Sequence, residues 1–338
     1  MLNAPSLPAP RGPQSAALLG ALRTLPRIDL APLTFSGDVL SDEDFQLCLY
    51  VCYELHYRGF AGVDPAWEWS PSLLAIRASL EREFERTLRR CVALPRCDDP
   101  AATPTAVRAL IDAASGPSLS AWTESHGRID HLRELAIHRS AYQLKEADPH
   151  TWAIPRLPAG RAKSALLRLQ ADEYGNGVPG ASHAELFADT MKALGLNPAY
   201  GNYLDAIPAV TLATVNLLSM FGLHRGRVGA CMGHLAVFEM TSVTPMTRYA
   251  AAHRRLLGHD RGAAFYDVHV VADAEHEVIA LDELLPGLVA LDPGLADDVL
   301  FGAATLLELE RRFAVHVLTR WDAGVSSLGR DLELAAVS

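Results

Sequence analysis

Hydrophobic and polar residues follow a helical spacing along nearly the whole chain. The pattern predicts long helices over residues 42–60, 70–94, 128–154 and 159–174. Alternating strand patterns are nearly absent, so we expect an all-α fold. Further helices are expected over 104–114, 118–125, 182–196, 199–224, 227–256, 260–280 and 294–323.

Residues at the ends of these segments indicate where the helices start and stop. Ser41 and Ser182 stand at expected N-cap positions, where a hydroxyl can accept a free backbone N–H. Pro149 is expected to bend or end part of its helix, because it has no N–H to donate. The chain is then divided into a flexible lead-in over 1–30, an N-terminal helical part over 31–125, a helical bundle over 126–325 and a tail over 326–338.

The composition narrows the classes of partner. The chain has 338 residues, of which 49% are hydrophobic, enough for a substantial core. Its net charge of −10 argues against nucleic acid, because phosphate binding needs a basic surface. No apolar run long enough for a membrane helix and no signal-peptide pattern is present. With five cysteines and no C-x-x-C, we expect reduced thiols in the cytoplasm, with Cys48 and Cys52 in the core.

The first chemical signal is the stretch FYDVHVVADAEHE, residues 265–277. It places His269, Asp273 and His276 at positions i, i+4 and i+7, so all three share one stripe of a helix. The same spacing also occurs on solvated helix faces. An exposed stripe, however, would not need valines at positions 268, 270 and 271 close by. We therefore interpret the stripe as a binding surface.

Two other segments carry acidic or imidazole groups in unusual surroundings. Glu173 and His183 flank a stretch rich in glycine and proline, which allows a helix end and a helix start to converge. Glu239 stands alone among apolar residues. A carboxylate in an apolar bundle is costly unless it is paired or bound to a cation. The alternative for Glu239 is a position at the polar edge of an amphipathic helix.

Together these residues make a candidate ligand set of three carboxylates and three imidazoles. Bridging carboxylates can hold two cations close together while imidazoles fill the remaining positions, as in non-heme iron pairs. Zinc usually takes fewer ligands in a tetrahedron, and ligand type alone also fits a redox-inert hydrolytic metal pair. The set is Glu173, His183, Glu239, His269, Asp273 and His276.

These residues resemble those of the heme-oxygenase-like diiron oxidases, also called iron-containing redox enzymes. That family takes a Glu and a His from one region, a Glu from a second helix and H-x-x-x-D-x-x-H from a third. The stretches LQADEYGNG, GHLAVFE and FYDVHVVADAEHE are similar to its signatures. The intervals between Glu173, Glu239 and His269 resemble those of the N-oxygenating branch. The likeness covers residues 130–325, and the stretch LYVCYELHYRGFAG resembles the family more weakly.

The resemblance implies a heme-oxygenase-like helical bundle to which the N-terminal helical part is an extension. It implies that the six residues hold two Fe(II) ions, with O₂ as co-substrate and no catalytic residue needed beyond the ligands. The expected reaction oxidises a small amino acid or amine in natural-product biosynthesis. N-oxygenation is one outcome; C–H activation with fragmentation, desaturation or cyclisation is the other.

Partners and alternative functions follow from the same observations. An external electron donor is expected, and the apolar N-terminal helices are a candidate homodimer face. A metal-dependent hydrolase that uses the same ligands to lower the pKa of a bound water is the first alternative. A non-enzymatic helical binding protein with an incidental His-rich stripe is the second.

A seventh ligand is expected upstream of Glu173, because some members of the family, among them an N-oxygenase, carry a further carboxylate there. Glu146 and Asp148 stand in about that place. We prefer Glu146, because Asp148 precedes Pro149 and is biased away from helical geometry. An ordinary acid at a helix end is the alternative for Glu146.

Other residues of the same types are assigned structural roles. Glu54 and His56 point apart on a helix at i, i+2, and His131 and His138 have no second carboxylate pattern nearby. Large apolar residues near the candidate ligands could form a substrate pocket, although such residues at helical spacing are more often core. The candidates are Phe187, Met191, Met220, Phe221, Phe238, Met240, Phe265 and Tyr266.

Overall fold

The structure is a computed structural model that describes residues 4–26 and 29–329. Within these ranges the regular structure is helical and contains no strand, which confirms the all-α prediction. Short 3₁₀ helices and one π-helical segment, Ala280–Leu284, connect the α-helices. The α-helices are α1 Pro13–Leu22, α2 Glu43–Glu54, α3 Pro71–Cys91, α4 Thr103–Ala113, α5 Leu119–His126, α6 Ile129–Gln143, α7 Asp148–Thr151, α8 Arg161–Glu173, α9 His183–Ala193, α10 Ala209–Leu223, α11 Val228–Thr241, α12 Val243–Leu257, α13 Ala264–Ile279, α14 Leu285–Leu291 and α15 Ala296–Asp322.

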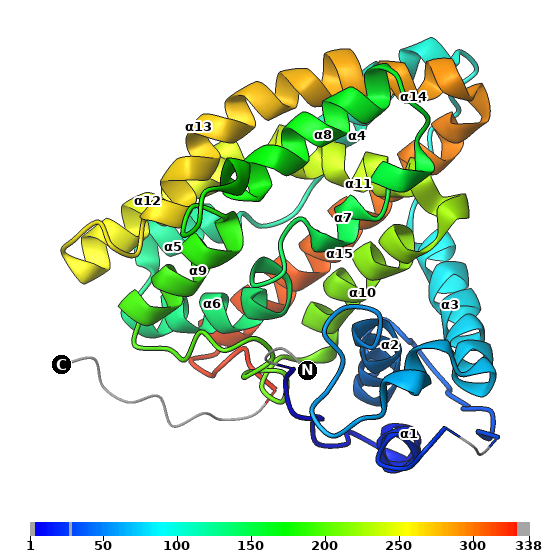
Figure 1. Ribbon diagram of the computed structural model, residues 1–338. Helices are drawn as coiled ribbons and strands as arrows, with labels where there is room; N and C mark the ends of the chain where they lie inside the picture. Colours follow the sequence, from blue (N-terminus) through cyan, green and yellow to red (C-terminus); the bar gives the residue numbers. More distant parts are fainter. Residues whose placement is uncertain (1–3, 27–28, 330–338) are drawn as a thin grey trace.

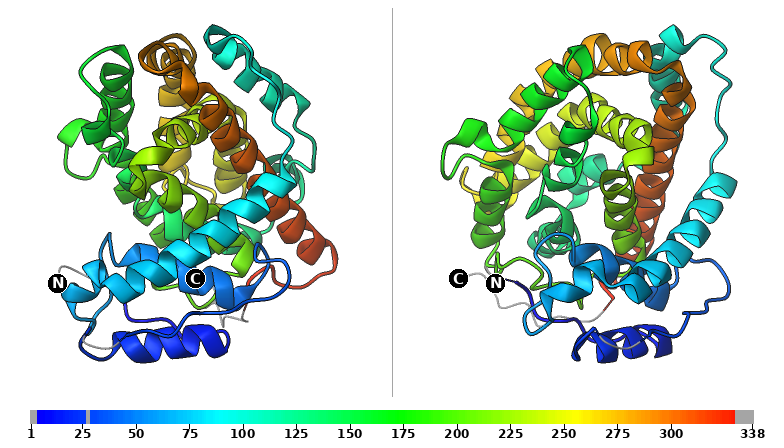
Figure 2. Two further views of the ribbon diagram at one scale, coloured as in Figure 1. Left: turned by 90° about the vertical axis from the view of Figure 1, so that its right-hand side faces the viewer. Right: turned by 45° about the vertical axis from the view of Figure 1, so that its right-hand side comes forward.

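Helices α1 and α2 lie at one end of the molecule, in the lower part of Figures 1 and 2, with α3 beside them. α1 packs on α2 and buries Leu18, Leu19 and Leu22. The prediction of a flexible lead-in over 1–30 is therefore wrong for residues 13–22, because their leucines have a partner helix to cover them. Residues 1–3, 27–28 and 330–338 lie outside the described part of the chain.

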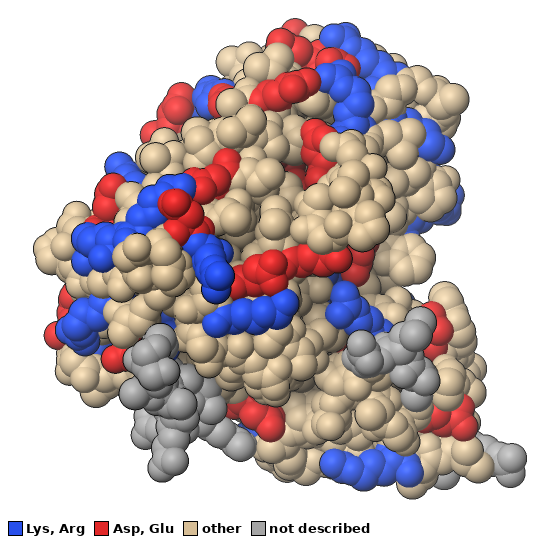
Figure 3. All heavy atoms as spheres, turned by 60° about the vertical axis from the view of Figure 1, so that its left-hand side comes forward, with Lys and Arg blue, Asp and Glu red and all other residues tan. Residues whose placement is uncertain are grey.

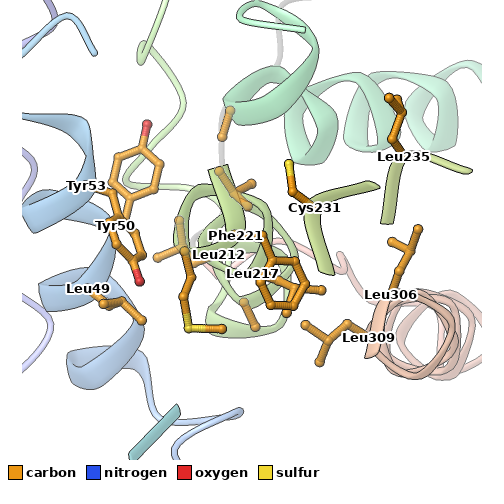
Figure 4. Close-up of a cluster of buried hydrophobic side chains, with 14 of the residues drawn as sticks. Leu49, Tyr50, Tyr53, Leu212, Leu217, Phe221, Cys231, Leu235, Leu306 and Leu309 are labelled. Carbon is orange, nitrogen blue, oxygen red and sulfur yellow. The ribbon is translucent and has the colours of Figure 1, made fainter. Parts of the chain in front are cut away.

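One hydrophobic core joins these helices to the rest of the bundle. α11 and α15 approach so closely that a Cβ on Gly233 would strike the backbone of Val299, and one on Gly302 that of Ala230. The boundary at residue 125 between the N-terminal helical part and the bundle stays a prediction. Figure 4 shows part of the core, where side chains of α2 face those of α10, α11 and α15: Leu49, Tyr50, Tyr53, Leu212, Leu217, Phe221, Cys231, Leu235, Leu306 and Leu309.

Two helix ends differ from the prediction. Asp42, not Ser41, caps α2, because its side chain accepts the backbone N–H of Phe45. Pro149 does not bend a long helix. Instead, α6 ends at Gln143, and Pro149 lies in the first turn of α7, where a missing N–H costs nothing.

Two long predicted helices are shorter or divided. The segment 199–224 becomes helical only at Ala209, directly after Pro208. The segment 227–256 breaks at Ser242 into α11 and α12. This second break matters for the site, because it turns Ser242 toward α13.

The surface carries charges of both signs, and the face in Figure 3 mixes acidic and basic side chains. Some of these charges pair between helices. Arg168 of α8 binds Glu283 at 2.8 Å, and Arg254 of α12 binds Asp267 of α13 at 2.5 Å. These pairs tie α13 and the segment after it to their neighbours. No described helix is both long and apolar enough to cross a membrane.

Candidate metal centre

The turn between α8 and α9 brings Glu173 and His183 together. Glu173 ends α8 and His183 begins α9, where Ser182 and Glu185 form a capping box. The chain reverses through glycines at positions 175, 177 and 180 that have positive φ angles, and Gly175 lies too close to the facing backbone for any side chain. As a result, Oε2 of Glu173 lies 2.7 Å from Nδ1 of His183.

The predicted stripe on α13 faces the interior. His269, Asp273 and His276 are buried because α8, α9 and α11 pack against this side of the helix. Val271 is 77% exposed and lies on the opposite side. The alternative of a solvated stripe is therefore wrong, although the neighbouring valines are not the reason.

Glu239 reaches the same place from α11 and is buried in spite of its charge. Its Oε2 lies 3.0 Å from Nδ1 of His276. The break after α11 places Ser242 beside Asp273, and the Ser242 hydroxyl donates to Oδ2 of Asp273 at 2.5 Å. Glu239 is therefore not at a polar helix edge, and Ser242 is a neighbour of the cluster that the sequence pattern did not indicate.

The side chains form two adjoining groups of buried, ligand-type atoms. Within each group one atom from every residue lies within 4.8 Å of the others. Glu173 belongs to both groups, which is the arrangement expected of a carboxylate between two cations. The first group is Glu146, Glu173, His183 and His269, and the second is Glu173, Glu239, Asp273 and His276.

Two buried atoms in the first group have no hydrogen-bond partner. They are Oε2 of Glu146 and Nδ1 of His183, whose contact with Glu173 is short but not aligned for a hydrogen bond. Leaving such atoms unpaired is costly. A cation between the members of the group would satisfy both. Carboxylate oxygens with imidazole nitrogens suit iron, so the residues present fit an iron pair.

Glu146 comes from the turn that follows α6, and its neighbours hold this turn in place. Nζ of Lys145 lies 3.1 Å from Oε2 of Glu54, and the two side chains are 1% and 0% exposed. Ala147 has a φ of 74°, a conformation that is strained for a residue with a Cβ. A buried ion pair and a strained residue thus flank Glu146, and they fix the direction of its side chain.

Asp148 does not join either group. It starts α7, so Pro149 did not keep it out of a helix, and that part of our reasoning was wrong. Its carboxylate accepts a hydrogen bond from the hydroxyl of Tyr174 at 2.8 Å instead.

In the metal-free protein, burial and neighbouring charges change the pKa values of the side chains in the cluster. Burial, with the Asp273 carboxylate beside them, raises the pKa of Glu173 and of Glu239 to about 7. Burial lowers the pKa of His269, but the Glu146 carboxylate outweighs it and raises the pKa to about 10. Asp273 and Glu239 likewise overcome burial and raise the pKa of His276 to about 11. These four groups therefore bind protons more tightly in the folded protein than in the unfolded chain.

We expect the metal-free protein to lose stability as pH rises from 7 to 9. Folded His269 and His276, whose pKa values the neighbouring carboxylates raise to about 10 and about 11, retain protons that the unfolded chain releases near the ordinary pKa of 6.5. This contribution is fully present below pH 6.5 and is lost as pH rises toward the folded pKa values. A bound metal replaces these protons, so the loss should be smaller in metal-loaded protein. Thermal unfolding of both forms across this range measures the effect, and parallel curves would contradict it.

Asp172 is a residue of the centre that the sequence did not reveal. Its Oδ2 lies 3.0 Å from Nε2 of His276, and its side chain is 42% exposed. If Nε2–H donates to Asp172, Nδ1 of His276 is left to face Glu239 and Asp273. His269 is oriented in the same manner, because its Nδ1 lies 2.7 Å from the carbonyl oxygen of Phe265 and its Nε2 faces the first group. Such outer partners fix the tautomer and orientation of ligating imidazoles.

Replacing Asp172 with alanine should weaken binding of one of two metal ions by about 10- to 100-fold, the usual effect of removing such a partner. Asp172→Asn should retain most of the affinity, because its amide oxygen still accepts the His276 N–H. Titration with Fe(II) under anaerobic conditions measures both steps. Asp189→Ala removes an exposed carboxylate of α9 and serves as the control. Equal loss of both ions, or no loss, would contradict this role.

A cavity of about 420 Å³ opens against both groups. Glu146, Glu173, Glu239, His269 and Asp273 contribute to its wall. Four of the predicted wall residues line the cavity. The other four are buried in the core and do not line it. Those that line it are Phe187, Phe238, Phe265 and Tyr266; those that do not are Met191, Met220, Phe221 and Met240.

Comparison with known proteins agrees with this geometry. Residues 133–311, just over half of the chain, match the family described as iron-containing redox enzyme. The matched range contains every residue of the two groups. A comparison with curated proteins finds no match. The chain therefore belongs to the iron-containing redox enzyme family and has its heme-oxygenase-like helical fold.

Proposed function

We propose that this chain is a non-heme diiron oxidase that uses O₂ to oxidise a small amino acid or amine. The observation that carries the proposal is Glu173, which two buried ligand groups share. A site for a single cation would need only one of these groups. Two ferrous ions held there would supply the electrons that reduce O₂.

The chain's own residues would provide placement and a dry environment. Glu146, His183 and His269 would hold one ion, and the second group the other, with Glu173 between them. Because all of these side chains are buried, bulk water is largely excluded from the groups. The adjoining cavity leaves room for a substrate. No side chain needs to act as a nucleophile.

Glu146 supports N-oxygenation as the reaction within this proposal. Its carboxylate lies in the first group, where the likeness to an N-oxygenase implied a further ligand. Fragmentation, desaturation and cyclisation are the other outcomes that product analysis would separate. A role in natural-product biosynthesis, an external electron donor and a homodimer stay predictions.

The test begins with protein purified without oxygen and given excess Fe(II). We expect two Fe(II) per chain and an optical transient when O₂ is added. A screen of amino acids and amines for O₂ consumption, with product masses read out, then identifies the reaction. The double variant His269→Ala, Asp273→Ala damages both groups and should remove the transient.

Fewer than two Fe(II) per chain at excess iron, with no transient, would overturn the proposal. Turnover with zinc and no O₂ consumption would favour a hydrolase. Function that survives the double variant would favour a binding protein.

A further inference from the structure

The cavity beside the metal groups has a second charged region. Arg139 of α6 and Glu310 of α15 both line it. Nη1 and Nη2 of Arg139 donate to the two carboxylate oxygens of Glu310 at 2.7 and 2.6 Å. The side chains are 27% and 28% exposed, so the pair is only partly buried where it lines the cavity. Arg311 also lines the cavity, but its carboxylate partner Glu308 does not.

This pair is held firmly and lies away from the metal groups. The guanidinium of Arg139 stacks over the ring of Phe313, 4.3 Å from its centroid. From Arg139 to the end of α6 at Gln143 is about 6 Å of axial rise, and Glu146 lies beyond that end. The charged pair and the first metal group are therefore separated along the cavity.

The cavity wall also carries many apolar and aromatic side chains, and Tyr142 lies between Arg139 and Glu146 in the chain. Tyr142 and Phe238 stack with their centroids 5.6 Å apart, and both line the cavity. Other lining residues of this kind are Leu235, Met246, Tyr249, Tyr266 and Leu306. The cavity thus suits a molecule with a charged head at one end and a largely apolar body that reaches toward the metal groups.

The charge of the pair selects the kind of head. A ligand with only a carboxylate would be attracted by Arg139 but repelled by Glu310. A ligand with only an ammonium group would be attracted by Glu310 but repelled by Arg139. A head that carries both charges can bind both residues, because guanidinium has five N–H donors and a carboxylate four acceptor positions. The α-ammonium and α-carboxylate of an amino acid form such a head.

We propose that Arg139 and Glu310 bind the zwitterionic head of an α-amino acid, whose side chain then extends along the apolar wall toward the metal groups. This inference rests on the proposed function and narrows its substrate class to α-amino acids. It also places the reacting atom on the distal part of the side chain, because the α-amino group is held at the other end.

Matched ligands test the head group. L-norleucine and L-arginine are each compared with the amine left by removing the carboxylate and with the acid left by removing the α-amino group. Binding to the Fe(II)-loaded protein is measured by calorimetry without O₂. At least one amino acid should bind about 10- to 100-fold more tightly than its amine and its acid, the range for charge-assisted hydrogen bonds. Equal binding across a set, or no binding by any member, would overturn the proposal.

Variants test the residues. Arg139→Gln and Glu310→Gln should each lose most of the preference for the zwitterion while they retain iron binding and the O₂ transient. Arg139→Lys keeps the charge and should lose less, and Arg311→Gln, on the same wall, should bind as the unchanged protein does. Variants that bind the amino acid normally would overturn the proposal. Iron binding is scored separately, and the calorimetry is repeated on metal-free protein, so failure of the diiron proposal is distinguishable.

Discussion

Replacing Glu173 with alanine is expected to prevent binding of both iron ions. The carboxylate is the one residue shared by the two buried groups, so its loss removes a ligand from each. Activity should fall by more than about 100-fold, beyond the effect of removing an outer partner. Fe(II) titration and O₂ consumption measure the two effects.

Single-group variants provide the matched comparison. Glu239→Ala removes a member of the second group only, and His183→Ala a member of the first only. Each should lose one ion and retain the other. Asp189→Ala, at an exposed position of α9, should retain both. If Glu173→Ala still bound one ion normally, Glu173 would not be a ligand shared by both ions.

The same substitution should leave the metal-free fold intact or make it more stable. Buried carboxylates that face one another cost stability, and the raised pKa values of Glu173 and Glu239 express that cost. Removing one of them relieves it. Loss of iron with unchanged or increased thermal stability would therefore separate a ligand from a residue that only supports the fold.

Replacing Lys145 with methionine is expected to lower the free energy of unfolding by about 3–5 kcal/mol. The substitution leaves Glu54 as a fully buried carboxylate without its cation. The hydroxyl of Tyr200 still donates to Glu54 at 2.6 Å, but it cannot neutralise the charge. Urea unfolding of the metal-free protein measures the change.

The control is Lys192→Met, which breaks an exposed pair with Asp189 and should change stability by less than about 1 kcal/mol. The double variant Lys145→Met, Glu54→Leu should recover part of the loss, because no uncompensated charge remains. Lys145→Met should also weaken the first metal group, since Glu146 is the next residue. A stability equal to that of the control would contradict the role assigned to the buried pair.

The sequence was sufficient wherever the relevant contacts are local. His269, Asp273 and His276 share a stripe because helix geometry alone places i, i+4 and i+7 on one face, and the glycine-rich turn indicated that Glu173 and His183 converge. The helix ends were less certain. Ser182 caps α9 as predicted, whereas Asp42, one residue after the predicted Ser41, caps α2.

Contacts between distant parts of the chain were decided by the tertiary structure. Asp172 and His276 are 104 residues apart, and Arg139 and Glu310 are 171 apart, so no local pattern pairs them. Glu146 was chosen over Asp148 from the sequence, but its place in the first group, beside the buried Lys145–Glu54 pair, is a feature of the tertiary structure. The sequence by itself therefore determined the helices, the family resemblance and the six candidate ligands. The packing of the helices decided which carboxylate is shared, which side chains orient the imidazoles and what the cavity can hold, because these depend on distances between helices that helical periodicity does not encode.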